Sequence, residues 1–388
     1  MREREFDKVY YLNELKKIDA IIAKGNLANE KIQLLEEDKL FIFKALGEEP
    51  KEVEENITID SALKKLEGKM RAEIKKLGAN NIEYIYYIAS FISRQRNEHQ
   101  PVYTTNITDV NKVLNECVEF YGKLDHVFYG IITRLVNHPI NLYNISENPE
   151  VIDECVWRNY SKLPVVNIYN TKSVLLYSKT VHEMQHQINH IINNNVYANY
   201  IGFNHLLNEC SSIFSELIFC DKLKEQNPNL IDVNSLYIER ISSIDSLSVN
   251  LMGYLQVMML LDEADFHLDI DTFKELLYEN FYCFDGHWTD YIIHYLDYNL
   301  YEKLKYLFSY LVALDIRTLY KDNPKDALKL LKYIIKLDLD TCDIESILKR
   351  KIDISSYKDG PYNHLQHSME VDSMRLELNL LNNKRLTK

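Results

Sequence analysis

The chain has 388 residues, of which 45 are basic and 58 acidic, so its formal net charge is −13. A protein of this charge is not expected to have nucleic acid or an anionic membrane as its main partner, because both would repel it. The first seven residues are mostly charged, so no signal peptide is predicted. The sequence has no run of 18 apolar residues, so no membrane span is predicted. Six scattered cysteines without a C-x-x-C pair then favour reduced thiols and a cytoplasmic location.

Helices dominate the predicted secondary structure. Only 10 glycines and 8 prolines interrupt the chain, and apolar residues recur mostly at helical spacing, which predicts a mainly α protein. Residues 1–135 are interpreted as an N-terminal helical lobe that forms one wall of a cleft. Its expected helices cover residues 7–24, 30–45, 62–77, 81–96 and 108–135, with Asp60 and Ser61 capping the third.

Residues 136–356 are expected to form the region that holds the functional site, and residues 357–388 a C-terminal polar tail. A helix is expected over residues 148–160, where Arg158 is interpreted as a solvated surface charge. Leu163–Tyr169 is rich in apolar and β-branched residues, which predicts a short strand followed by a turn. We expect this strand to lie at a sheet edge, where an extended ligand could be added as one more strand.

The helix expected over residues 174–195 carries His182-Glu183-Met184-Gln185-His186, the pattern H-E-x-x-H. Residues four apart lie one above the other on a helix face, so the two histidines can share one metal ion. The pattern is typical of zinc sites in which the intervening glutamate acts as a general base. Such a site needs a third ligand, which often comes from a second helix.

A second apolar helix is expected over residues 204–225, and Glu209 lies near its start, with 22 residues between it and His186. Two histidines and a carboxylate leave a fourth tetrahedral position for water, as in catalytic zinc sites. Glu216 lies two turns further along the same face, where it could bond the second nitrogen of a ligand histidine. His190 continues the face of the first helix, but eight residues of helix span about 12 Å, so three histidines cannot hold one ion.

The order of these segments resembles a known family. A strand ending in Asn167-Ile168-Tyr169, a turn, the H-E-x-x-H helix and then E-x-x-S-x-x-x-E over residues 209–216 is similar to the oligoendopeptidase F and thimet oligopeptidase family of zinc metallopeptidases. The resemblance covers roughly residues 163–356. Angiotensin-converting enzyme-like and carboxypeptidase Taq-like enzymes are structural cousins that remain open as alternatives.

The resemblance implies a multi-helical zincin of the gluzincin type with a deep substrate cleft beside the short strand. It implies one Zn²⁺ per chain with His182, His186 and Glu209 as ligands, Glu183 as the catalytic base, and a supporting contact from Glu216. The chain departs from the family in two ways. Gln185 stands where the family usually has glycine, and the part before the strand is shorter than usual.

Two helical segments rich in tyrosine are expected over residues 287–321. Acyl transfer needs a donor to the oxyanion, and a tyrosine hydroxyl or a histidine can supply it. The string Tyr306-Leu307-Phe308-Ser309-Tyr310 is similar to a tyrosine string of the family, and its two tyrosines lie one helical turn apart. We therefore predict Tyr310 and Tyr306 as catalytic donors, with His294 as a further candidate.

The resulting hypothesis is a zinc endopeptidase that hydrolyses internal bonds of short peptides. The family's helical lobes enclose the site and exclude folded proteins, whereas a smaller lobe could leave this cleft more open. Three alternatives stay open: a zinc-containing peptide-binding protein without turnover, a peptidase dedicated to one peptide, and a helical interaction protein with a chance motif.

Overall fold

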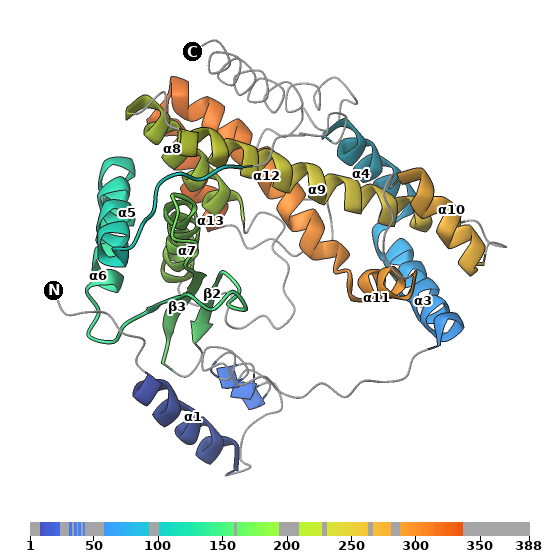
Figure 1. Cartoon of the computed structure of the whole chain (residues 1–388), viewed down its shortest axis with the longest axis horizontal. Helices are drawn as coiled ribbons and strands as arrows, with labels where there is room; N and C mark the ends of the chain where they lie inside the picture. Colours follow the sequence, from blue (N-terminus) through green and yellow to red (C-terminus); the bar gives the residue numbers. More distant parts are fainter. Residues whose placement is uncertain are drawn as a thin grey trace.

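The computed structural model describes residues 8–23, 31–32, 35–36, 38–39, 42, 58–92, 101–158, 161–193, 209–226, 231–262, 267–280 and 288–336. Within these ranges the chain is mostly helical and contains one three-stranded sheet (Figure 1), which confirms the predicted mainly α fold. The predicted tail at 357–388 lies outside the described residues.

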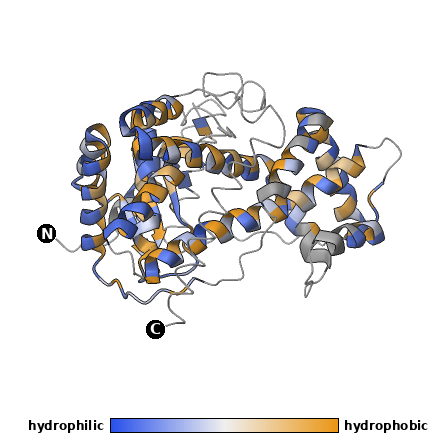
Figure 2. Cartoon of the chain, turned by 90° about the horizontal axis from the view of Figure 1, so that it is seen from above, coloured by the Kyte–Doolittle hydropathy of each residue, from blue (hydrophilic) through white to orange (hydrophobic). Residues whose placement is uncertain are grey.

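The described helices follow the amphipathic segments of the sequence. Figure 2 shows hydrophobic and hydrophilic residues interleaved along them, as expected of helices that bury one face. Their bounds are α1 (Lys8–Ala23), α3 (Ile59–Leu77), α4 (Ala79–Ile92), α5 (Val110–Leu124), α6 (His126–Val136), α7 (Leu175–Ile192), α8 (Cys210–Gln226), α9 (Ile231–Leu261), α10 (Ile270–Asn280), α11 (Trp288–Asp297), α12 (Leu300–Asp322) and α13 (Pro324–Ile335).

Two helix boundaries differ from the prediction because of capping side chains. Thr58, and not Asp60, caps α3, since its hydroxyl accepts a hydrogen bond from the backbone N–H of Ser61. The single helix expected over residues 108–135 is two helices. Asp125 has an extended backbone, and its carboxylate accepts two backbone N–H groups of α6 at 2.9 and 3.2 Å. These bonds satisfy donors that a new helix start leaves unpaired, which stabilises the break.

The sheet has the order β1-β3-β2 and consists of β1 (Tyr143–Ser146), β2 (Glu154–Arg158) and β3 (Leu163–Tyr169). β3 pairs in parallel with β1, with Tyr143 opposite Val166, and antiparallel with β2, with Glu154 opposite Asn167. The predicted strand at Leu163–Tyr169 is therefore confirmed, but its predicted edge position is wrong. It is the central strand, and β2 is an edge strand of the sheet.

The helix predicted over residues 148–160 is wrong, because residues 154–158 form β2. Val156 and Trp157 are residue types that favour strands, and pairing with β3 overrides the helical spacing. Arg158 is correspondingly not a surface charge. It is fully buried at the end of β2, 3.3 Å from Glu14 (Nη2 to Oε1) and 3.9 Å from Asp38 (Nε to Oδ1).

The helices pack in two regions, which α12 joins because it contacts both α8 and α9 (Figure 1). In the first, here called the site region, α7 packs against β3, β2, α5, α6 and α8. In the second, here called the distal region, α3, α4 and α10 pack against α9, and α11 packs against α3. The site region contains all the residues of the H-E-x-x-H motif.

α9 is the one helix within the described ranges that is long and apolar enough to cross a membrane by length and composition. Its most apolar 18-residue window has a mean hydropathy of 1.3, and 56% of that window is buried inside the protein. α4 packs extensively along α9, so contacts within the protein account for the apolar surface of this helix.

Candidate metal centre

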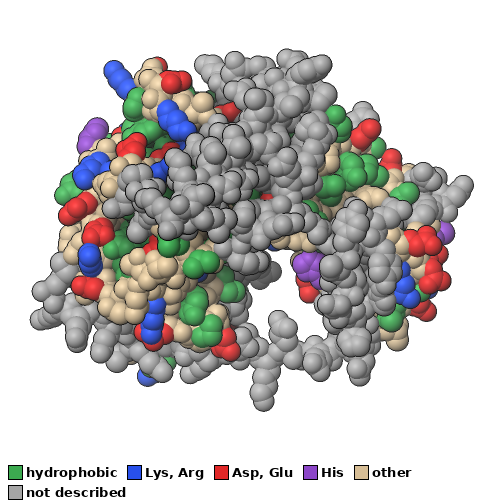
Figure 3. Space-filling view, turned by 45° about the horizontal axis from the view of Figure 1, so that its top comes forward, with side chains coloured by type: hydrophobic (Ala, Val, Ile, Leu, Met, Phe, Trp, Pro, Cys, Tyr) green, Lys and Arg blue, Asp and Glu red, His purple; other side chains and the backbone are tan. Residues whose placement is uncertain are grey.

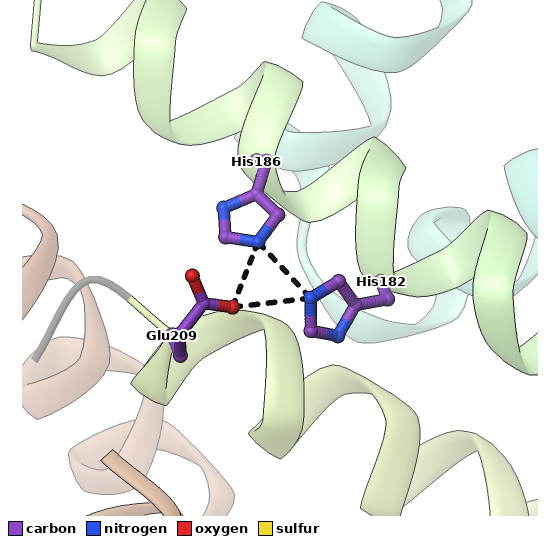
Figure 4. A group of neighbouring side chains, drawn as sticks. All are labelled: His182, His186 and Glu209. Atoms are coloured by element: carbon purple, nitrogen blue, oxygen red, sulfur yellow. Dashed lines mark hydrogen bonds and ion pairs between the residues drawn. The ribbon is translucent and has the colours of Figure 1, made fainter. Parts of the chain in front are cut away.

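Three side chains from the neighbouring helices α7 and α8 meet at one point (Figure 4). His182 and His186 lie one turn apart on α7, and Glu209 lies immediately before α8. Glu209 Oε2 is 3.1 Å from His182 Nε2 and 3.0 Å from His186 Nε2, and the two nitrogens are 3.0 Å apart. The structure thus brings together the three residues that the sequence predicts as ligands.

The position of α7 is fixed by hydrogen bonds to the sheet and to α5. Gln187 Nε2 donates to the carbonyl oxygen of Pro164 on β3 at 3.0 Å, and Gln187 Oε1 accepts the hydroxyl of Tyr143 on β1 at 2.5 Å. The hydroxyl of Tyr121 on α5 donates to the carbonyl oxygen of Val181 at 2.8 Å. These buried bonds hold the helix at a set height above the sheet, which places its histidines opposite the start of α8.

Glu216 makes the contact that the sequence predicts for it. Its Oε1 atom contacts Nδ1 of His182, and its Oε2 atom accepts the hydroxyl of Ser178 at 2.9 Å and forms an ion pair with Arg240. Burial alone would raise the pKa of Glu216, but Arg240 and His182 lower it. An ionised Glu216 keeps the proton of His182 on Nδ1. The lone pair of Nε2 then points to the same place as His186 Nε2 and Glu209 Oε2, where a cation could bind.

Arg240 was not predicted from the sequence. It lies on α9, 24 residues after Glu216, so no helical or turn spacing links the two residues. Its only signal is that a buried carboxylate such as Glu216 needs a cationic partner, and several cations could have met that need.

Gln185 occupies the position where the family usually has glycine, and it is fully buried between α7 and α8. Its Oε1 atom accepts the hydroxyl of Ser215 at 2.9 Å, and its Nε2 atom donates to Asn189 at 3.1 Å. Asn189 in turn exchanges hydrogen bonds with Ser211 at 2.9 and 3.1 Å. Small serines on α8 therefore make room for the longer side chain and satisfy its amide, so the substitution leaves the ligand geometry intact.

Glu183 is buried beside the two histidines, and burial raises its pKa to about 7. Its interactions with His182 and His186 act against this rise, whereas the charges of Glu209 and Asp153 add to it. Its Oε2 atom has no hydrogen-bond partner among the described residues. A carboxylate with an unpaired oxygen and a pKa near neutrality is suited to accept a proton.

His190 lies one turn beyond His186 but faces the sheet. Its ring packs against Trp157 with 5.7 Å between the ring centroids, and it bonds the backbone of Cys155 on β2. Burial lowers its pKa to about 4, so this imidazole is neutral. His190 is therefore a packing residue between α7 and β2, in line with its distance from the ligand set.

Tyr306 and Tyr310 line a pocket of about 370 Å³ that also contains His182 and Arg240. Tyr310 is buried, and its hydroxyl has no hydrogen-bond partner among the described residues. Burial and the charges of Glu209 and other carboxylates raise the pKa of Tyr306, so its hydroxyl stays protonated. Both tyrosines thus offer a proton donor on the α12 side of the metal centre.

His294 is not among the residues that line this pocket. It lies exposed on α11, where its ring contacts those of Tyr295 and Tyr298. Its assignment as a donor stays a prediction.

Lys305 is a further residue that the sequence analysis missed. Its Nζ atom lies 3.4 Å from Glu209 Oε1 and 2.7 Å from Glu302 Oε1, and the residue is only 9% exposed. Burial alone would lower its pKa, but Glu209 and Glu302 raise it, so Lys305 is cationic. It contacts Oε1 of Glu209, whereas Oε2 of Glu209 faces the two histidines. The signal was its place immediately before Tyr306, the first residue of the tyrosine string.

The donor set is suited to a zinc ion. In a tetrahedral site with bonds of about 2.0–2.1 Å, the donor atoms are about 3.3 Å apart. The three separations here are 3.0–3.1 Å, so small rotations of the side chains would admit the ion. Glu183, Glu209 and Glu216 are all buried; Arg240 pairs with Glu216, and Lys305 lies between Glu209 and Glu302. A cation would balance this buried negative charge.

No model of a protein family matches the chain, and no curated protein matches its sequence. Solved structures do match. A putative peptidase from Chlamydophila abortus is 14% identical, with a TM-score of 0.51, over 96% of this chain and 64% of that one. A "putative oligoendopeptidase F" from Bacillus anthracis is 13% identical, with a TM-score of 0.46, over 91% of this chain and 64% of that one. A third match, PZ peptidase A with an inhibitor, is 12% identical, with a TM-score of 0.48, over 97% of this chain and 67% of that one.

The chain shares the helical fold of the putative peptidase from Chlamydophila abortus. The resemblance drawn from the H-E-x-x-H helix and its neighbours is thereby confirmed for the fold. The chain spans about 64% of the length of the first two of these proteins. The roles of individual residues are therefore argued from the geometry of this chain.

Proposed function

We propose that the protein is a zinc-dependent endopeptidase that hydrolyses internal bonds of short peptides. The observation that carries this proposal is the convergence of His182, His186 and Glu209 beside Glu183, whose Oε2 atom has no partner within the described part of the chain. A structural metal site has four protein ligands and no need of a neighbouring base, whereas a hydrolytic site needs an open ligand position and a base.

Zinc bound by His182, His186 and Glu209 would supply a Lewis acid that polarises a carbonyl group and lowers the pKa of water. Glu183 accepts the proton of the attacking water and then donates it to the nitrogen of the leaving amine. Glu216 holds the Nδ1 proton of His182 and so maintains the ligand's tautomer throughout.

Tyr310 and Tyr306 are the proposed donors to the oxyanion of the tetrahedral intermediate. The unpartnered hydroxyl of Tyr310 and the protonated hydroxyl of Tyr306 both lie in the wall of the pocket at His182. A preorganised donor in a site shielded from water stabilises the developing negative charge more than a solvent molecule would.

The edge strand β2 offers a place for the substrate backbone. It packs against α7, and the charge of Asp153, next to β2, is close enough to raise the pKa of Glu183. An extended peptide could add to this edge by main-chain hydrogen bonds, which recognise any sequence. We infer that peptides bind along β2 with the scissile bond beside Glu183, and that the protein acts in the cytoplasm.

The test is mass spectrometry of a pool of synthetic peptides of mixed length, incubated with the zinc-loaded protein and with Glu183→Gln. This substitution keeps the size of the side chain and removes the base. We expect internal cuts by the wild type, and a loss of about 10²–10⁴-fold in the variant at equal zinc content.

The other possible results would contradict the proposal or favour one of its alternatives. Equal cutting by both proteins would point to a contaminating peptidase and contradict the proposal. Zinc binding without cuts by either protein would support a peptide-binding protein without turnover, or a peptidase dedicated to one peptide that the pool lacks. A protein that gains no thermal stability from zinc would indicate that the motif is not a metal site.

A further inference from the structure

A second pocket lies where α5, α8 and α12 meet, away from the metal centre. Its volume is about 690 Å³, against about 370 Å³ for the pocket at His182. This size is within the range of sites that hold organic ligands. Five cationic side chains line it, from three different helices: Lys123, Lys222, Lys224, Arg317 and Lys321. Asp221 and Glu225 are the two carboxylates in its lining.

One of these carboxylates is committed to the wall of the pocket. Asp221 forms two parallel bonds with Arg317, with Nε to Oδ2 at 2.8 Å and Nη2 to Oδ1 at 2.7 Å. It also accepts the hydroxyl of Tyr237 on α9. This arrangement ties α8, α9 and α12 together and neutralises the arginine, and it leaves Glu225 as the other carboxylate in the lining beside four lysines.

Lys123 and Lys222 are two cations of this lining that no described carboxylate pairs at ion-pair distance. Burial lowers the pKa of Lys222 and the like charge of Lys123 lowers it further, whereas the charge of Glu225 acts in the opposite direction. The chain as a whole carries −13, and Figure 3 shows acidic side chains interspersed with basic ones on the face in view. Two repelling lysines in one cavity are therefore an exception to the general pattern of the surface.

Apolar and aromatic side chains complete the pocket. Lys222 Nζ lies 5.3 Å from the ring centroid of Phe120, and Leu124, Ile218 and Tyr320 form further parts of the lining. Such walls favour the planar or apolar body of an organic molecule, while the lysines favour its charged groups.

We propose that this pocket binds an organic anion that carries at least two negative charges, as phosphate or carboxylate groups, on a planar or apolar body. The bound charges would lie between Lys123 and Lys222, and the body would lie against Phe120 and Tyr320. This proposal does not depend on the proposed peptidase activity.

The test is isothermal titration calorimetry of the full chain with ADP, pyrophosphate, inorganic phosphate and citrate at constant ionic strength. ADP and pyrophosphate test phosphate ligands with and without a planar body, and citrate tests the carboxylate source. We expect at least one polyanion to bind, and Lys123→Ala with Lys222→Ala to weaken it at least about tenfold, since two charge-assisted contacts are lost.

Two further variants control for net charge and for folding. Lys64→Ala with Lys75→Ala removes the same charge from exposed positions on α3 and should leave affinity within about twofold of the wild type. Lys123→Arg with Lys222→Arg keeps both charges and should retain binding. Absence of binding by all four probes at millimolar concentration would overturn the proposal, and so would an equal loss in the α3 variant.

Discussion

The interface between α7 and α8 in the site region and the core around Tyr254 in the distal region are both buried, yet their chemistry is opposite. The first is built from hydrogen-bonded polar side chains: Ser178, Gln185, Asn189, Ser211, Ser215 and Glu216. The second is built from aromatic rings, in which Tyr254 stacks on Tyr298 at 4.6 Å and meets Tyr295 edge-on at 5.4 Å.

The two regions therefore contribute differently to the protein. Hydrogen bonds between α7 and α8 fix the positions of the ligands, whereas ring packing in the distal region contributes mainly to stability. A buried polar group needs its partner at a set distance and angle, so each bond between α7 and α8 constrains where the ligands lie. Ring packing is less directional and contributes mainly through the apolar area that it buries. Substitutions in the distal region should therefore change stability and leave the metal centre alone, whereas substitutions between α7 and α8 should change both.

The largest effect on stability is expected for Tyr254→Ala in the distal region. The substitution leaves a cavity among three rings and removes the hydroxyl that donates to Glu73 at 2.8 Å. We expect a loss of about 3–5 kcal/mol in the free energy of unfolding, measured by urea denaturation. Tyr254→Phe keeps the ring and should cost only about 1–2 kcal/mol. A fall in the zinc affinity of folded Tyr254→Phe would break the proposed separation of the two regions.

Glu216→Gln tests the position of the ligands directly. The amide no longer carries the charge that holds the Nδ1 proton of His182, and it leaves Arg240 without its ionic partner. We expect the zinc affinity to fall by about 10–100-fold, measured by competition with a chromophoric chelator. Unchanged affinity would show that His182 is oriented without help from Glu216.

Gln185→Ala tests the polar bonds that accommodate this departure from the family. The shorter side chain leaves the hydroxyl of Ser215 and the amide of Asn189 each without one partner. We expect a loss of about 1–3 kcal/mol in the free energy of unfolding, together with weaker zinc binding. Gln226→Ala, at an exposed position at the end of α8, is the matched control and should be neutral within about 0.5 kcal/mol. Equal effects of the two substitutions would contradict a specific role for Gln185.

The smallest expected effect is a dependence on pH. Glu183 must be ionised to accept a proton, and burial raises its pKa to about 7 while nearby positive charge lowers it. We expect kcat/KM for a peptide to be constant above about pH 8 and to fall, by at most about tenfold per pH unit, as the pH decreases through and below the pKa of Glu183. A rate that rises on acidification would show that another group is the base.

The convergence of His182, His186 and Glu209 could be predicted from the sequence because the spacing of these residues is local. His182 and His186 are related by one helical turn, and Glu209 and Glu216 by two, so helix geometry alone brings each pair to one face. Residues that reach the centre from other helices, such as Arg240 and Lys305, have no such spacing. The split at Asp125 and the strand at β2 were missed for a related reason, since a cap and a pairing partner outweighed the local pattern.

The buried arginine at the end of β2 has a practical consequence for anyone who shortens the gene. Arg158 is fully buried, and the carboxylates of Glu14 and Asp38 lie 3.3 and 3.9 Å from its guanidinium. An expression product that starts at residue 58 would retain His182, Glu183, His186 and Glu209 but would lose both of these carboxylates. Loss of one partner from a buried pair costs about 3–5 kcal/mol, so such a product is expected to accumulate in inclusion bodies.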